Sequence, residues 1–181
     1  MSTTKVITGP VRLSYTHLLE PTSSFEGQDP KFSTVILIPK DDEDTLKKIR
    51  AAQKQALEDG KSTKFNGKVP QNWKNTLRDG DEEADLEKNP EYAGHYFMSV
   101  GANADRRPGI VDSQLQPVME YDQVYSGVYA RVSINAFPFN TKGNKGVSFG
   151  LNNVMVLGYG DRLAGGASAE SDFADFAENL L

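Results

Sequence analysis

The stretch from Gly127 to Phe139, GVYARVSINAFPF, carries different chemistry on its two faces. Side chains alternate across a β-strand, so every second residue lies on the same face. One face is small and apolar, as expected for a core strand. The other face carries Tyr129, Arg131, Ser133, Asn135 and Phe137. Aromatic rings stack on unpaired bases and arginine holds phosphates, so this face is equipped to bind single-stranded nucleic acid. The alternative is an amphipathic strand whose aromatic residues cover a second core.

Three further segments place cations beside aromatic residues. A hairpin turn from Asn140 to Lys145 is expected to carry basic residues at its tip. The segment from Lys61 to Arg78 has five basic residues and no acidic one, and a second basic turn precedes Pro108. Each of these segments is also compatible with an ordinary solvated turn. The DNA-binding candidates they add are Phe139, Lys142, Lys145, Phe149, Arg107, Lys68, Trp73 and Lys74.

The composition disfavours catalysis. Cysteine is absent, which removes disulfides, thiolate metal sites and thiol nucleophiles, and the two histidines, His17 and His95, are too few for a typical zinc site. The acidic run that begins at Asp79 and Asp81 could supply oxygen ligands to Mg²⁺, but it lies in a polar loop without a structured frame. No P-loop spacing is present. We therefore expect no catalytic residues, no cofactor and no metal.

The pattern of apolar residues predicts an all-β domain with one main helix and long inserted loops. Alternation begins at Val11, and the buried-strand pattern of residues 31–39 ends at Pro39. Residues at helical spacing between Asp41 and Gly60 predict a helix that follows the second strand. Further strands are expected at residues 94–102, 124–139 and 146–158. The connection over residues 60–91 is either a functional loop or a poorly ordered one, and could hide a strand.

The net charge of -5 is concentrated near the end of the chain. After Arg162 there are four acidic residues and no basic one, so the rest of the chain has 20 basic and 21 acidic residues. We predict a domain over residues 1–162 and a flexible acidic tail over residues 163–181. The tail is either a solubilising end or a partner-binding segment, with Asp172, Phe173, Asp175, Phe176 and Glu178 as candidate contacts. No apolar stretch is long enough to span a bilayer, and the first residues lack the apolar region of a signal peptide.

Several segments together resemble the single-stranded-DNA-binding proteins encoded in the replication modules of tailed phages. The specific blocks are SGVYARVSINAF and GNKGVSFGLNNV, and weaker matches are VRLSY and LIPKDD. The resemblance implies an OB-fold barrel and binding of unpaired DNA with little sequence preference. By motif it assigns DNA contacts to Tyr129, Arg131, Phe137, Lys145 and Phe149.

The same resemblance implies a non-catalytic role in phage DNA replication or recombination in the cytoplasm of the infected bacterial host. The expected partners are single-stranded DNA and, through the acidic tail, replication or recombination proteins. An autoinhibitory role of the tail is expected as well, and self-association into a homo-oligomer is left open. The alternative function is a phage structural or adaptor protein that uses the aromatic strand face to bind another protein.

Overall fold

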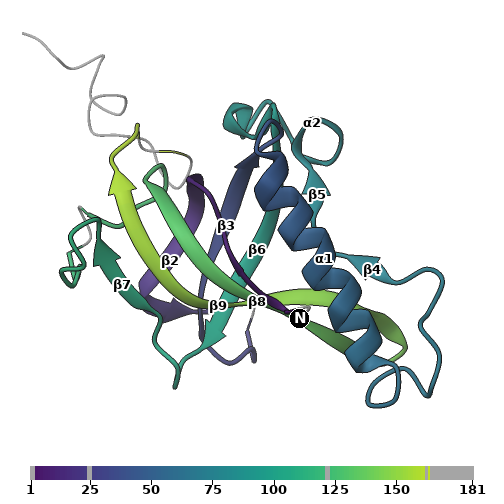
Figure 1. The fold of residues 1–181 in the computed structure, drawn as a ribbon. Helices are drawn as coiled ribbons and strands as arrows, with labels where there is room; N and C mark the ends of the chain where they lie inside the picture. The colour runs from purple at the N-terminus through teal and green to yellow at the C-terminus, as the bar shows by residue number, and fades with distance from the viewer. Residues whose placement is uncertain (1–2, 24–25, 121–122, 162, 164–181) are drawn as a thin grey trace, which may run out of the picture.

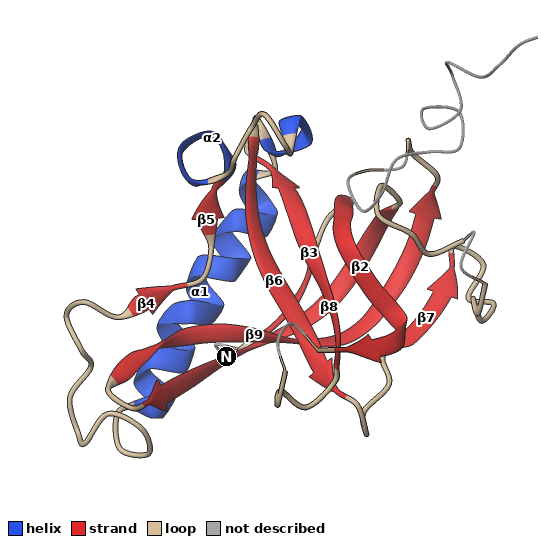
Figure 2. Cartoon of the chain, turned by 180° about the vertical axis from the view of Figure 1, so that it is seen from behind, coloured by secondary structure: helices blue, strands red, loops and turns tan. Residues whose placement is uncertain are grey.

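The computed structural model describes residues 3–23, 26–120, 123–161 and 163, which are dominated by strands, with one long helix packed against one side of the sheet (Figures 1 and 2). The two helices are α1 (Glu43–Gly60) and the short α2 (Gly80–Glu83), and a 3-10 turn spans Pro90–Tyr92. The strands are β1 (Lys5–Ile7), β2 (Val11–Thr22), β3 (Lys31–Pro39), β4 (Lys74–Asn75), β5 (Arg78–Asp79), β6 (His95–Asn103), β7 (Gly109–Asp112), β8 (Tyr129–Thr141) and β9 (Asn144–Gly158). The predicted acidic tail, apart from Leu163, lies outside the described residues.

Five strands close the sheet on itself. β2 pairs with β3, β3 with β6, β8 with β9 and β8 with β2, all antiparallel, and β6 meets β9 in parallel. The parallel contact is a single pair, Gly101 with Gly150, so the sheet is closed but is not a regular barrel. A partly open five-stranded barrel is the OB-fold plan, and the predicted fold class is confirmed. As the sequence indicates, α1 follows β3, the second of these five strands. An OB-fold usually carries its helix after the third strand.

The connection over residues 60–91 contains the strands that sequence patterns could not resolve. β4 pairs in parallel with the start of β9, and β5 pairs with the start of β6. These two short strands occupy the gap where β6 and β9 diverge (Figure 2). Gly146 is required here, because a Cβ atom on it would collide with the backbone of Lys74. The long connection is therefore a structural part of the sheet closure.

The core lies inside the closed sheet and beneath α1. The Asp42 carboxylate caps the helix by accepting a hydrogen bond from the backbone N–H of Thr45. The predicted apolar face of α1 is buried, and so is the apolar face predicted for β8. These residues are Leu46, Ile49, Ala52, Ala56 and Leu57 in the helix and Ala130, Val132, Ile134 and Ala136 in the strand. In the part of the chain that the structure describes, no helix is long and apolar enough to cross a membrane.

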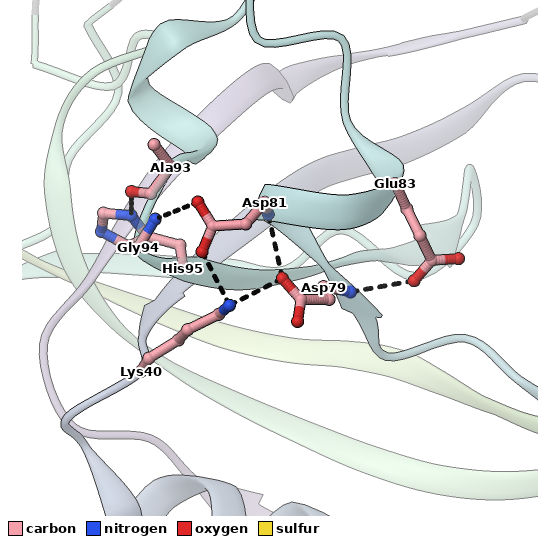
Figure 3. A network of polar contacts seen from close by, with 7 residues as sticks. All are labelled: Lys40, Asp79, Asp81, Glu83, Ala93, Gly94 and His95. Carbon is pink, nitrogen blue, oxygen red and sulfur yellow. Dashed lines mark hydrogen bonds and ion pairs between the residues drawn. The ribbon is translucent and has the colours of Figure 1, made fainter.

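A polar network joins the end of β3 to α2 and to the start of β6 (Figure 3). Lys40 Nζ lies 2.7 Å from Asp79 Oδ1 and 2.7 Å from Asp81 Oδ2. Asp81 Oδ1 accepts a hydrogen bond from the backbone N–H of Gly94 at 3.1 Å, and the Asp79 N–H donates to Glu83 Oε2. The two carboxylates considered above as Mg²⁺ ligands thus hold a lysine, and no group of three or more metal-ligating side chains occurs among the described residues.

The network makes the free energy of unfolding depend on pH. Hydrogen bonds from Lys40 lower the pKa values of Asp79 and Asp81 below their ordinary value of 3.8 and raise the pKa of Lys40. Because the carboxylate pKa values are lowered on folding, their contribution is complete above that ordinary value and is lost as the pH falls through the folded-state values. We predict that Lys40→Met lowers stability at neutral pH and flattens its decrease in acid, measured by urea unfolding from about pH 7 to about pH 2.

The matched control is Lys48→Met, which removes the same charge from an exposed position of α1. An acid dependence in Lys40→Met identical to that of the wild type would contradict the assignment.

Candidate functional site

A cleft of about 1100 Å³ lies on the outer face of the sheet, where β3, β6, β8 and β9 come together. Its floor is built from outward-facing residues that alternate along each strand with buried core residues. Nearly all of them are short: Ser33, Ser99, Gly101, Ser148, Gly150 and Asn152. The register explains why they meet, since Gly101 pairs with Ser33 on one side and with Gly150 on the other. Short side chains leave the cleft open above the sheet backbone.

Gly150 marks open space in this floor. A Cβ atom built there would lie 3.8 Å from the Gly101 carbonyl oxygen and 3.9 Å from Phe137 Cε1, which is ordinary van der Waals contact. The backbone conformation of Gly150 is not one restricted to glycine. The fold therefore tolerates a side chain at this position, and a larger side chain would extend into the cleft.

The rim of the cleft combines one aromatic ring with several cations. Phe137 on β8 is 42% exposed. Lys31, Arg106 and Arg107 also line the cleft, against one carboxylate from Asp105. Arg107 is fixed in place, because its Nη1 donates to the Leu19 carbonyl oxygen at 3.1 Å and its guanidinium lies 5.2 Å from the centre of the Phe32 ring. The excess of cations gives this cleft a positive field despite the negative net charge of the chain.

Two of the predicted site residues, Phe137 and Arg107, lie in this cleft. The prediction for a third residue, Phe149, is corrected by the structure. Phe149 borders the cleft but is only 2% exposed and belongs to the hydrophobic core. The reason is its register, because Phe149 pairs with Ala136, which is on the inner face of β8. Its ring is not available for stacking.

The structure brings together the two basic segments that the sequence leaves far apart. Asn140 Nδ2 at the β8–β9 hairpin donates to the Lys64 carbonyl oxygen at 3.0 Å, and Lys74 pairs with Gly146. The hairpin tip and the loop after α1 consequently occupy the same end of the molecule (Figure 2). We call this the basic end, defined by Lys64, Lys68, Lys74, Lys142 and Lys145. Near it, Phe139 is half-buried, and Trp73 is half-buried with its ring packed against the core.

Tyr129 and Arg131 lie away from the cleft. Tyr129 begins β8, eight residues before Phe137, and the guanidinium of Arg12 lies 5.2 Å from the centre of its ring. The Arg131 guanidinium is bound to the backbone beside β8, because its Nη1 donates to the Thr8 carbonyl oxygen at 3.1 Å. The single aromatic platform expected on this strand is therefore two separate regions. The tail candidates from Asp172 to Glu178 lie outside the described residues.

Comparison with known proteins identifies the relatives of this chain. A model of the family described as Enterobacter phage Enc34, ssDNA-binding protein, matches residues 4–180. The chain belongs to this family. The resemblance noted in the sequence is thereby confirmed, and the family is one of binding proteins rather than enzymes. A curated relative, putative protein p50 of Acyrthosiphon pisum secondary endosymbiont phage 1, is 30% identical over 178 residues, which cover 94% of this chain and 92% of that protein.

Solved structures show the same fold. The single-stranded DNA-binding protein of bacteriophage Enc34 in complex with ssDNA superposes with a TM-score of 0.73 at 24% identity, covering 90% of each chain. Another similar structure is gp2.5, a single-stranded DNA binding protein encoded by bacteriophage T7. Its TM-score is 0.63 at 14% identity, covering 98% of this chain and 97% of that chain.

Proposed function

We propose that this protein binds single-stranded DNA without catalysis, with the strand held in the cleft above Gly101 and Gly150. The cleft is the observation that carries the proposal. OB-folds bind oligonucleotides on the face of their second and third strands, which are β3 and β6 here, and on adjoining loops. The cleft lies over that face and continues onto β8 and β9. Family membership supports the same ligand.

The chemistry of the cleft suits unpaired bases. Phe137 offers a partly exposed ring for stacking, which a base inside a duplex cannot reach with its face. Arg106, Arg107 and Lys31 are placed to neutralise phosphates, and the serine and asparagine side chains offer hydrogen bonds to sugars and base edges. Every base has a stacking face, so this mode of binding requires little sequence preference.

The proposed setting is phage DNA replication or recombination in the bacterial host cytoplasm. In this setting the basic end would hold phosphates of DNA that leaves the cleft, because two of its lysines, Lys142 and Lys145, lie on the same hairpin as Phe137. The acidic tail would compete with DNA for the positive surfaces and would dock replication or recombination proteins. A phage structural or adaptor protein would instead use the aromatic face of β8 to bind another protein and would not bind DNA.

A size series at Gly150 tests the cleft. We predict that Gly150→Ala has little effect, whereas Gly150→Val and Gly150→Leu weaken binding of a labelled single-stranded oligonucleotide by at least about tenfold, or 1.4 kcal/mol. The added atoms occupy the space of the ligand, and a glycine in a strand is itself weakly unfavourable, so folding stability should stay equal or rise. Fluorescence anisotropy measures affinity and urea unfolding measures stability. Equal affinity across a folded series would refute the cleft as the binding site.

Salt dependence tests the basic end. If Lys142 and Lys145 contact phosphates, replacing both with alanine should make the slope of log affinity against log salt shallower by about 1.4, since each contact to a single strand contributes about 0.7. Lys47→Ala with Lys48→Ala removes the same charge from exposed positions of α1 and is the control. A slope that changes equally in the two double variants would show a general charge effect only.

Truncation tests the tail. A chain ending after Gly166 lacks Glu170, Asp172, Asp175 and Glu178, which are the acidic residues after Arg162. We expect it to bind single-stranded DNA more tightly than the full chain, most clearly at low salt, where attraction between tail and protein is least screened. The same truncation should weaken capture of a replication partner. Unchanged DNA affinity at low salt would exclude autoinhibition.

A further inference from the structure

Tyr129 is a partly exposed aromatic ring that the fold holds rigidly. Its exposed fraction is 42%, and the guanidinium of Arg12 lies 5.2 Å from its ring centre. Arg12 is fixed in turn, because Nε donates to the Gly127 carbonyl oxygen at 3.1 Å and Nη2 donates to the Asp161 carbonyl oxygen at 2.7 Å. Gly160 packs against the ring so closely that a Cβ atom there would lie 2.7 Å from Tyr129 Cε2.

Tyr159 provides a second ring at the same end of the sheet. It is 62% exposed and stacks on Tyr125, with ring centres 6.2 Å apart and planes inclined by 12°. The Tyr125 hydroxyl donates to the Gly160 carbonyl oxygen at 2.7 Å, which ties this pair to the backbone beside Tyr129. Both rings are held before any ligand arrives, so a ligand that stacks on them loses little entropy in ordering them.

The outward face of β8 runs from this end to the cleft. Tyr129 and Phe137 lie on the same outward face, and the residues between them on that face are Arg131, Ser133 and Asn135. None of these five side chains is a carboxylate, so none of them repels phosphates. Eight residues of strand span roughly 26 Å. A strand with duplex-like spacing of about 3.4 Å per phosphate covers that span with roughly eight nucleotides, within the range of about 4 to 16 known for OB-folds.

We infer that Tyr129 and Tyr159 form a second stacking subsite, which binds nucleotides of the same DNA strand that occupies the cleft. The inference rests on the proposed function, because it requires a strand in the cleft. The second subsite makes the affinity for DNA depend on the length of the oligonucleotide. Short oligonucleotides fill the cleft alone, whereas longer ones reach the tyrosines and gain affinity as a tethered second contact.

The test uses the full chain and labelled oligothymidylates of increasing length, from about 5 to about 20 nucleotides. We expect Tyr159→Leu and Tyr129→Leu each to weaken binding of the longest oligonucleotide at least about fivefold, because each variant removes the stacking of one base. Binding of the shortest should be unchanged. Leucine keeps an apolar side chain of moderate size, and Tyr159→Phe should retain wild-type affinity because it keeps the ring.

Tyr15→Leu is the matched control, because Tyr15 is also 42% exposed but donates to Asn89 Oδ1 on another part of the surface. Equal losses at all lengths, or no loss at any length, would overturn the second subsite while leaving the cleft in place. So would variants that change self-association but not affinity for DNA. No binding of the wild type at any length would refute the proposed function itself.

Discussion

The antiparallel pairing of β8 with β9 is the interaction on which the other parts of the structure depend. The ladder runs from Tyr129 opposite Gly158 to Thr141 opposite Asn144. Its inner face completes the core, its outer face forms one wall of the cleft, and its tip contributes to the basic end. Two register shifts interrupt the ladder, one after Tyr129 and one after Ser133. Such irregularities bend and twist strands, which helps so long a hairpin to curve around a core (Figure 1).

The cleft follows from the weakest part of the sheet closure. β6 and β9 share only the pair between Gly101 and Gly150, and both residues lack the side chain that would fill the outer face. A Cβ atom at position 101 would lie 2.9 Å from the Phe32 carbonyl oxygen, so close strand packing favours glycine at Gly101. Gly150 carries no such steric requirement. Its small size is therefore better explained by the space above it than by the packing below it.

How much of the structure can be predicted from the sequence depends on how far apart in the chain the interacting residues lie. Alternation along β8 and helical spacing in α1 are local signals, and both elements form, although β8 begins at Tyr129 rather than at residue 124. The cleft floor draws its short residues from three strands, β3, β6 and β9, and a serine or glycine has no local pattern that marks it as part of a site. The burial of Phe149 could not be predicted for the same reason. Antiparallel partners share a face, so its pairing with the core residue Ala136 decides its burial, and register is not readable from one strand.

The segregated charges of residues 61–91 are explained by the path of the chain. This segment leaves the C-terminal end of α1, runs back beside the helix and ends near the start of β6 (Figure 1). Its basic half therefore lies with Lys142 and Lys145, and its acidic half reaches Lys40 before the N-terminus of α1. Cations near the end of a helix and anions near its start also match the helix dipole. The nearly balanced charges of residues 61–91 thus coexist with positive surfaces, because most of the carboxylates of this segment lie at the other end of the helix from its lysines.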